Sequence, residues 1–361
     1  SLRVGPEAEF ERPSLAAKAA QDGDVIEIAG GNYPGDTAVW TKNDLLIRSI
    51  GGVAKLNAKG IRLAEDKAIW VIRGNNIRIE NIEFANASSK DKNGAGIRAE
   101  RNMLEIISCY FHDNESGVMT SNNKNAYLRI EDTEFSRNGH QSGQAHQIYV
   151  GTIDEFILTG SFVHESVIGS AVKSRARKSS IHYNRIVDEG QGRSNYTIDL
   201  SNGGEAYILG NILQQSPFTE NYTLISYAPE GIRWDDNKIF ITHNTIVNDR
   251  KGGNFFFNHS QIQAQVINNL LIGEGSPVEG PAVLIGNIVD YGKGFWGGFD
   301  ESLGGLAGSR DNHFFKEVGV VDRSTYSYKL RNKSQAIDLA VALPPEVEKT
   351  LAPLKEHRPP L

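Results

Sequence analysis

The chain has 361 residues, of which 39% are hydrophobic and 23% are charged, and its formal net charge is −6. This balance excludes general nucleic-acid binding, which needs a basic surface to displace counterions. The sequence contains no stretch of about 18 apolar residues of the kind that spans a membrane. A single cysteine, Cys109, excludes an intramolecular disulfide and a cysteine-based zinc site.

The first predicted element is a short helix over residues 13–22, rich in alanine and leucine. Ser14 is expected to be its N-cap, and Gly23 is expected to stop it. The following stretch, "GDVIEIAGGNYPG" at residues 23–35, reads as a strand that ends in a turn. Such a helix is suited to covering the open end of a repetitive hydrophobic core.

A short motif then recurs along the chain: an apolar residue, two spacers, a small residue or Asn, one spacer and another apolar residue. It occurs as "IENIEF", "IISCYF", "IEDTEF", "LTGSFV", "IHYNRI", "ILGNIL", "ITHNTI" and "VINNLL", with fourth positions at Ile82, Cys109, Thr133, Ser161, Asn184, Asn211, Asn244 and Asn269. The intervals of 23 to 33 residues are those of solenoid coils with loops of variable length. Alternating Ile, Val, Phe and Tyr predict short strands, so the coils stack as a right-handed parallel β-helix.

The asparagines support this interpretation, because Asn tolerates the left-handed backbone of a corner and its amide can bond to neighbouring coils. We therefore predict an all-β chain with one domain over residues 1–361. Its parts are a capping helix at 13–22, coils over 23–290, and a C-terminal coil and tail over 291–361.

Alternation along each strand also predicts which side chains leave the core together. The first predicted outward column is Arg98, Met119, Tyr149, Lys173, Asp199, Ser226 and Phe257. The second column, two positions further on, is Glu100, Ser121, Gly151, Arg175, Ser201, Ala228 and His259. Successive coils lie about 4.8 Å apart, so neighbours in a column can contact one sugar residue.

Tyr149, Lys173, Arg175 and Asp199 are thereby predicted to meet on three consecutive coils, and they combine acid, base and phenol. His146, close to Tyr149 in sequence, joins them as a candidate acid or base. In the same stretch, "SAVKSRARKS", Arg177 and Lys178 are expected to be solvated charges at a turn.

Flanking segments add candidate substrate-binding residues with aromatic rings and charges of both signs. These are Arg98, Glu189, Arg193, Tyr227, Glu230, Arg233 and Trp234. Such a groove suits a carbohydrate, whose ring faces are apolar and whose edges are polar. Glu189, Asp199 and Glu230 could instead gather Ca²⁺, although their spacing matches no dedicated calcium motif.

Parts of the chain also resemble known families. The opening stretch at residues 23–35 and "YKLRNKSQAIDLA" at 328–340 resemble the first and last coils of pectate-lyase-like β-helix proteins. The central "VKSRARKSSIHYNRI", followed by "YILGNIL", resembles the alginate lyase and chondroitinase B family of polysaccharide lyases. The resemblance implies that Lys173 is the base that removes the C5 proton of a uronic acid, with Ca²⁺ neutralising the sugar carboxylate.

The next coil departs from that family, because "IDLSNGG", with Asp199 in the outward position, replaces its Arg-His pair. A different acid is then needed, and Tyr149 and His146 are the candidates. The leading hypothesis is a secreted or periplasmic lyase acting on an anionic polysaccharide by β-elimination, with Arg175 binding the carboxylate. The alternatives are a glycoside hydrolase using Asp199 with Glu189 or Glu230, a uronate C5-epimerase, and a non-catalytic carbohydrate-binding β-helix.

Overall fold

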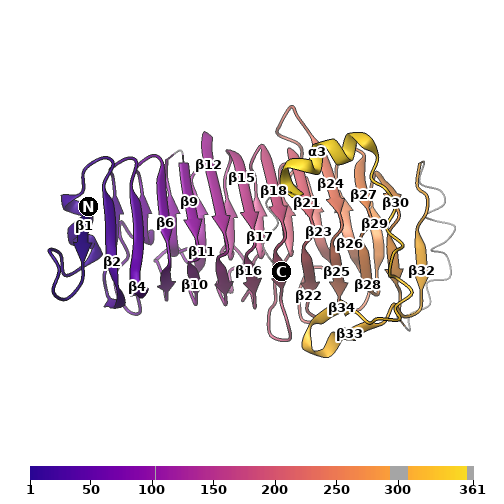
Figure 1. Ribbon diagram of the computed structural model, residues 1–361, viewed down its shortest axis with the longest axis horizontal. Coiled ribbons are helices and arrows are strands. Elements are labelled where there is room, and N and C mark those ends of the chain that lie inside the picture. The colour runs from indigo at the N-terminus through magenta and orange to yellow at the C-terminus, as the bar shows by residue number, and fades with distance from the viewer. Residues whose placement is uncertain (102, 293–307, 356–361) are drawn as a thin grey trace.

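The computed structural model describes residues 1–101, 103–292 and 308–355, and shows an elongated solenoid of stacked coils (Figure 1). The strands pair in parallel between successive coils and form three ladders along the length of the molecule. Because crossovers between parallel strands are right-handed, this is the predicted right-handed parallel β-helix. No helix in the described part of the chain has the length and apolar character needed to cross a membrane.

Each ladder takes one strand from each coil. The first ladder comprises β3 (Ala38–Trp40), β5 (Ala68–Ile72), β8 (Ala95–Ala99), β11 (Ser116–Thr120), β14 (Ile148–Val150), β17 (Val172–Ser174), β20 (Ile198–Leu200), β23 (Thr223–Tyr227), β26 (Asn254–Asn258) and β29 (Ser276–Glu279). The second comprises β6 (Ile77–Glu80), β9 (Met103–Ile107), β12 (Asn123–Glu131), β15 (Ile153–Thr159), β18 (Lys178–His182), β21 (Glu205–Leu209), β24 (Lys238–Thr242), β27 (Ala264–Ile267) and β30 (Ala282–Ile285).

The third ladder comprises β7 (Ile82–Ala85), β10 (Tyr110–His112), β13 (Glu134–Ser136), β16 (Phe162–His164), β19 (Arg185–Val187), β22 (Ile212–Gln215), β25 (Thr245–Asn248), β28 (Leu270–Gly273), β31 (Ile288–Asp290) and β32 (His313–Phe315). At the N-terminal end, β1 (Leu2–Val4) pairs with the long strand β2 (Val25–Pro34), which pairs with β4 (Leu46–Asn57). Strand β4 then continues into both the second and the third ladder.

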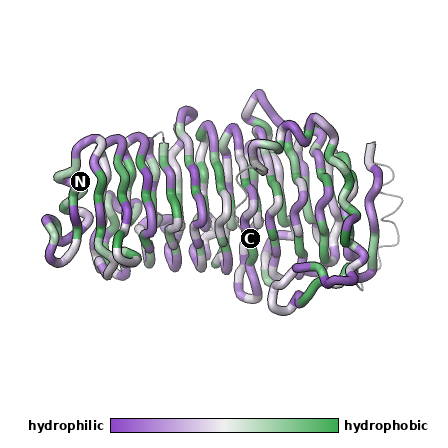
Figure 2. The backbone as a smooth tube through the Cα atoms, in the orientation of Figure 1, coloured by the Kyte–Doolittle hydropathy of each residue, from purple (hydrophilic) through white to green (hydrophobic). Residues whose placement is uncertain are grey.

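The core runs through the middle of the coils, and hydrophobic residues recur at the same places from coil to coil (Figure 2). In the N-terminal half the repeat packs aromatic rings against one another, edge to face for the two tryptophans and stacked for the phenylalanines. Ring centroids are 5.1 Å apart for Trp40 and Trp70, 4.9 Å for Phe84 and Phe111, and 5.0 Å for Phe111 and Phe135. These spacings are close to the separation of neighbouring strands, so the inward side chains pack directly above one another.

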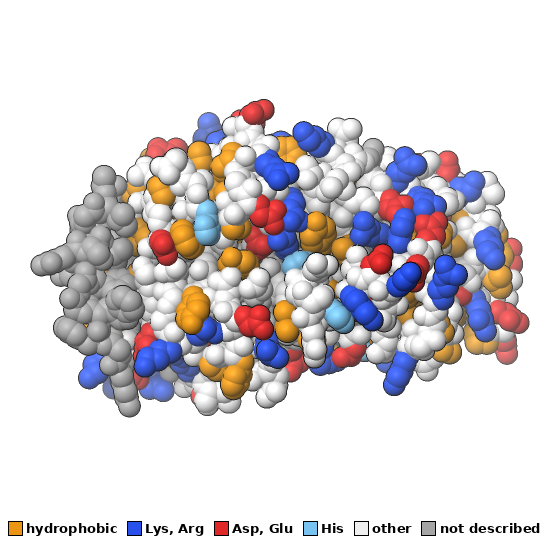
Figure 3. Space-filling model, turned by 180° about the vertical axis from the view of Figure 1, so that it is seen from behind, with side chains coloured by type: hydrophobic (Ala, Val, Ile, Leu, Met, Phe, Trp, Pro, Cys, Tyr) orange, Lys and Arg blue, Asp and Glu red, His pale blue; other side chains and the backbone are white. Residues whose placement is uncertain are grey.

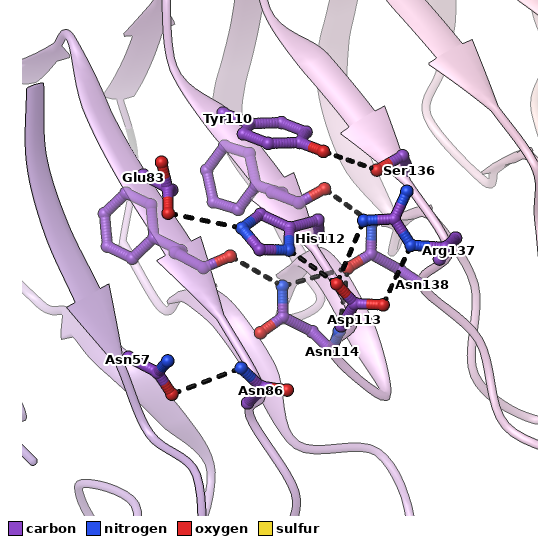
Figure 4. Close-up of polar contacts among 12 residues, drawn as sticks. Asn57, Glu83, Asn86, Tyr110, His112, Asp113, Asn114, Ser136, Arg137 and Asn138 are labelled. Atoms are coloured by element: carbon purple, nitrogen blue, oxygen red, sulfur yellow. Dashed lines mark hydrogen bonds and ion pairs between the residues drawn. The ribbon is translucent and has the colours of Figure 1, made fainter. Parts of the chain in front are cut away.

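The predicted corner residues form a buried hydrogen-bonded ladder at the turn between the second and third ladders. The side chain of Asn211 accepts hydrogen bonds from the backbone and side-chain amides of Asn184, and donates to the carbonyl of Ile181. Thr133 and Ser161 continue the ladder with hydroxyl groups. A similar contact between buried Asn114 and Asn138 is visible in Figure 4.

The capping helix is present as α1 (Pro13–Ala19) and starts at residue 13 as predicted, but Ser14 is not its N-cap and it ends three residues earlier than predicted. Its N-cap is Arg12, and Pro13 occupies the first helical position, where its fixed φ suits the helix. The carboxylate of Asp36, after β2, accepts the backbone N–H of Ser14 and so caps the helix from outside. The helix ends with Ala20 as its C-cap, three residues before Gly23.

The C-terminal segment leaves the coils after β32 and folds back over the outside of the solenoid (Figure 1). Strands β33 (Val320–Asp322) and β34 (Ser327–Leu330), joined by the helical turn η1 (Arg323–Thr325), pair antiparallel. Residues 328–340 therefore do not form the final parallel coil that the sequence suggested. Helix α3 (Pro345–Lys355) packs Val347 and Leu351 on the second ladder. Residues 293–307 and 356–361 of the predicted tail lie outside the described residues.

Candidate functional site

The outer face of the first ladder carries the first predicted column in the register expected from sequence. The second column lies just beyond the strand ends, and one of its members, Ala228, is buried in the core instead of facing outward. Pairing aligns Arg98 with Met119, Met119 with Tyr149, Tyr149 with Lys173, Lys173 with Asp199, Asp199 with Ser226, and Ser226 with Phe257. Their inward neighbours, such as Ile148, Val172 and Ile198, are fully buried. The register follows from the alternation, because a slip of one residue would turn the hydrophobic side chains outward.

Lys173 lies between two carboxylates. Its Nζ is 3.0 Å from Asp199 Oδ2 and 3.0 Å from Glu230 Oε1. Burial lowers the pKa of the Lys173 ammonium, but attraction to Asp199 and Glu230 outweighs burial and holds the pKa above its usual value. Although Arg175, Arg177 and Lys178 are close to Lys173 in sequence, the ionised groups in direct contact with its ammonium are acids.

Arg175 is the first residue beyond β17, and its guanidinium makes two kinds of contact. Its Nη2 donates to both carboxylate oxygens of Glu230, at 2.7 and 2.9 Å, and its Nε donates at 3.1 Å. Its Nη1 donates to Tyr149 Oη at 2.6 Å. The phenol oxygen accepts this hydrogen bond, so its own proton points away from Arg175.

We call Tyr149, Lys173, Arg175, Asp199 and Glu230 the Lys173 cluster. Within it the side chains become more exposed from Asp199 (3%) through Lys173 (15%) and Arg175 (20%) to Glu230 (38%). Asp199 is thus the buried partner of the cations, and it also accepts a hydrogen bond from Ser201 at 2.9 Å. Glu230 is the partner nearest to solvent.

Glu230 reaches the cluster from the loop that follows β23. Ala228 (φ 58°) and Gly231 (φ 85°) both have left-handed backbone, and the Gly231 N–H donates to the Ala228 carbonyl at 3.0 Å. This tight turn directs Glu230 back over the preceding coil. Trp234, further along the same loop, donates from Nε1 to the Arg175 carbonyl at 3.1 Å and so fixes the loop against β17.

His146 packs against Tyr149, with ring centroids 5.6 Å apart and the planes 18° from parallel. Burial, together with the nearby charges of Lys173 and Arg175, lowers the pKa of His146 to about 3. The imidazole is therefore neutral at ordinary pH. The Ser170 N–H donates to Nδ1 at 2.9 Å, which places the ring proton on Nε2.

His259 is a neighbour of the cluster that was not selected from the sequence, although it belongs to the second column. It stacks on Phe257 with ring centroids 3.7 Å apart. Burial lowers the pKa of His259, while the charges of Glu279 and Asp199 act in the opposite direction. Membership of the column was the signal that could have identified it.

Several predicted binding residues lie elsewhere. Tyr227 is fully buried, and its Oη donates to the Gly204 carbonyl at 2.7 Å, so it belongs to the core and cannot contact a sugar. Glu189 lies at the turn after β19, where its backbone N–H donates to Gln214 Oε1. Its negative charge, together with burial, raises the pKa of Tyr326. Arg193 pairs with Glu220 at 3.6 Å, and Arg233 is exposed on the Glu230 loop.

Arg177 and Lys178 are not free turn charges as predicted. Arg177 contacts Asp154 at 2.6 Å and Glu205 at 3.1 Å, and Lys178 contacts Glu155 at 2.8 Å. Lys178 begins β18 of the second ladder. The short stretch of four cations therefore turns a corner of the coil, and only Lys173 and Arg175 share the face of the first ladder.

A second polar cluster lies on the outer face of the third ladder (Figure 4). His112 contacts Asp113 at 2.6 Å and Glu83 at 3.4 Å, and Arg137 contacts Asp113 at 3.0 Å. Figure 3 likewise shows acidic and basic side chains interspersed over the surface seen from behind. These groups satisfy one another, as is typical of a surface ion-pair network.

The Lys173 cluster does not fit a Ca²⁺ site. Asp199 and Glu230 are already paired with cations, while Glu189 lies on another side of the coil. Among the described residues there is no group of three or more His, Cys, Asp or Glu side chains that could hold a metal ion.

Comparisons with known proteins show likeness of fold. The structure is similar to that of pectate lyase Pel9A, with a TM-score of 0.58 and 13% sequence identity over 95% of this chain and 93% of that one. It is also similar to an alginate lyase from Paenibacillus sp. str. FPU-7, with a TM-score of 0.54 and 15% identity over 74% of this chain and 95% of that one. No protein-family model matches the sequence, and no curated protein matches it significantly.

Proposed function

We propose that the protein is a polysaccharide lyase that cleaves a uronic-acid polymer by β-elimination at the Lys173 cluster. The proposal rests on the way in which the Glu230 carboxylate is bound. A carboxylate is held by Arg175 and Lys173 on the open face of a β-helix, with the Tyr149 phenol bonded to the same guanidinium. A site that holds a carboxylate in this way is suited to the carboxylate of a uronate.

Glu230 marks the position that the substrate carboxylate takes. It is the most exposed member of the cluster and comes from a surface loop, so it can be displaced at lower cost than buried Asp199. Once the uronate replaces it, Arg175 neutralises the carboxylate next to the C5 proton. This neutralisation stabilises the negative charge that develops when the proton is removed.

In this mechanism Lys173 is the base and Tyr149 is the acid. Displacement of Glu230 removes part of the attraction that raises the pKa of the Lys173 ammonium, which must first release its proton to solvent. The neutral amine then takes the C5 proton, the electron pair of the C5–H bond forms the C4–C5 double bond, and the C4–O bond breaks. The Tyr149 hydroxyl, whose proton points away from Arg175, protonates the departing oxygen. His146 stacks on Tyr149 and holds the phenol in place as a positioning residue.

The arrangement is less suited to hydrolysis. A glycoside hydrolase needs one protonated carboxylic acid beside the scissile bond. Burial raises the pKa of Glu230, but its bonds to Arg175 and Lys173 outweigh burial and hold that pKa below its usual value. Glu230 is therefore ionised at neutral pH and is not a donor of the kind that hydrolysis requires.

The fold supports testing elimination first, because it is shared with a pectate lyase and an alginate lyase. The experiment is incubation with a panel of polymers: pectate, alginate, glucuronan, chondroitin and neutral controls. Elimination leaves an unsaturated uronate, so we expect ultraviolet absorbance and reducing ends to rise together on one acidic polymer. Reducing ends without absorbance would identify a hydrolase. A changed uronate configuration without chain cleavage would identify an epimerase, and either result would overturn the proposal.

A polysaccharide substrate also places the protein outside the cytoplasm, secreted or periplasmic.

A further inference from the structure

Arg98 differs from the other cations near it on the first ladder. Lys67 contacts Glu100 at 2.6 Å, and Arg73 contacts both Glu100, at 2.9 Å, and Glu65. Arg98 forms no ion pair with any described residue. The polar contact that the structure shows for its side chain is from Nη1 to Met119 Sδ, at 3.7 Å. Its Nε is buried and lacks a hydrogen-bond partner among the described residues.

A partly buried guanidinium without a counterion is unfavourable, because water is removed and no acceptor replaces it. Buried polar atoms in folded proteins are nearly always hydrogen-bonded, so an exception calls for a physical explanation. An anion from outside the chain would supply the missing acceptor. A guanidinium is also the side chain best matched to a carboxylate, because its fork of N–H groups meets both oxygens.

The register fixes where such an anion would lie relative to the Lys173 cluster. Arg98 pairs with Met119, Met119 with Tyr149 and Tyr149 with Lys173, so Arg98 is two coils from Tyr149 and three from Lys173. At the usual strand spacing these separations are about 10 and 14 Å along the solenoid axis. Arg98 is therefore too far away to hold the carboxylate that Arg175 holds.

We propose that Arg98 binds the carboxylate of a second uronate in the same polymer chain, at a distal subsite two coils from Tyr149. The inference rests on the proposed function, because it takes a uronic-acid polymer as the ligand. The polymer would then lie along the column, parallel to the solenoid axis, and cross Met119 between the two cationic positions. Met119 is 6% exposed and offers a narrow apolar contact there.

The test measures binding of size-defined acidic oligosaccharides from the cleaved polymer, or from pectate and alginate if no polymer is cleaved. It uses the full chain carrying Lys173→Ala to prevent turnover. In that background, Arg98→Met removes the charge and keeps an apolar stem beside Met119, and Arg98→Lys keeps a charge without the fork. Lys18→Met, on the exposed side of α1, is the matched control for loss of one cation.

We expect affinity to rise with length once an oligosaccharide spans both positions. Arg98→Met should lower the affinity for these longer oligosaccharides by about tenfold. The shortest ligands should bind equally well with and without the change, and Arg98→Lys should recover part of the loss. Thermal unfolding checks the alternative of a structural role. Loss of an unpaired cation should leave the melting temperature unchanged or raise it, whereas a structural Arg98 would lower it.

Equal affinity of Arg98→Met and Lys18→Met for every length would overturn the distal subsite. If the unmodified chain still cleaves the polymer by elimination, the proposed function stands without the subsite. A uniform loss of affinity at all lengths would also contradict the subsite, because it would place Arg98 at the central position. If no acidic ligand binds and no polymer is cleaved, both proposals are wrong.

Discussion

Lys173 has two carboxylate partners, of which one is fixed within a strand and the other lies on a surface loop. Asp199 lies within a strand of the first ladder and is buried, whereas Glu230 comes from a loop and is partly exposed. The ammonium is thus kept protonated by one permanent partner and one replaceable partner. Substrate binding that removes Glu230 takes away part of the attraction that raises the pKa of Lys173.

The pH dependence of catalysis should report this arrangement. If Lys173 is the base, kcat/KM rises as pH approaches the raised pKa of its ammonium. Glu230→Gln removes one attracting carboxylate, so this pKa falls and the rising limb moves to lower pH, by about one unit. The other charged groups facing Lys173, namely Asp199 and Arg175, are unchanged in the variant.

Glu220→Gln is the control for this measurement, because Glu220 is an exposed carboxylate paired with Arg193. In this control, the pH range over which kcat/KM rises should be the same as in the unmodified protein. A limb that stays fixed in Glu230→Gln would show that Glu230 does not act on the base.

His146 should make the protein less stable in acid. Its pKa is about 3 in the folded protein, against 6.5 for an ordinary histidine, so the unfolded chain takes up the proton first as pH falls. The free energy of unfolding that His146 contributes is complete above pH 6.5. As pH falls from 6.5 toward 3, this stabilisation decreases by about 1 kcal/mol per pH unit.

Denaturant unfolding of the protein and of His146→Gln at a series of pH values isolates this contribution. The stability difference between the two should shift in favour of the variant as pH falls. Asp188 acts in the opposite direction, because burial raises its pKa to about 6, but it is present in both proteins and cancels. A difference that does not change with pH would contradict a buried neutral His146.

At the scale of the element, the corner ladder is what fixes one coil above the next. Each Asn side chain occupies a buried corner and bonds to groups of the neighbouring coils. The intervals in sequence were sufficient to predict this ladder, because the corner recurs once per coil whatever the loop length. Asn287 and Asn312, which extend it, were missed for two different reasons. "LIGNIV" at residues 284–289 matches the motif but places Asn287 only 18 residues after Asn269, and "SRDNHF" at 309–314 lacks the leading apolar residue.

Asn211→Ala should destabilise the fold strongly. It leaves the Asn184 amides without their acceptor and the Ile181 carbonyl without its donor, all in a buried corner. At about 1–3 kcal/mol for an orphaned buried group, the loss should be on the order of 3 kcal/mol. Denaturant unfolding measures it, with Asn32→Ala at an exposed position as the control. Equal stability of the two variants would mean that the ladder contributes little.

Over the whole molecule, sequence alternation predicted the first column on the face of the first ladder, because strand geometry leaves one choice of inward side chain. The second column was not predicted as well, because its residues follow the strand ends and Ala228 turns into the core. The chemistry within the columns was harder to predict. Glu230 meets Lys173 only because Ala228 adopts a left-handed turn, and a non-glycine residue gives little warning of that conformation. The pairing of Arg177 and Lys178 with acids of neighbouring coils also depends on the corner that follows β17.

If elimination occurs at Lys173, two lysines of the same short stretch should differ in their effect on activity. Lys173 faces the cluster, while Lys178 pairs with Glu155 on the second ladder. The measurement is the initial rate of ultraviolet absorbance on the acidic polymer that the unmodified protein cleaves. Lys173→Ala should lower the rate by about 100-fold or more, and Lys178→Ala should leave it nearly unchanged. A Lys173→Ala variant that retains the rate of the unmodified protein would show that Lys173 is not the base.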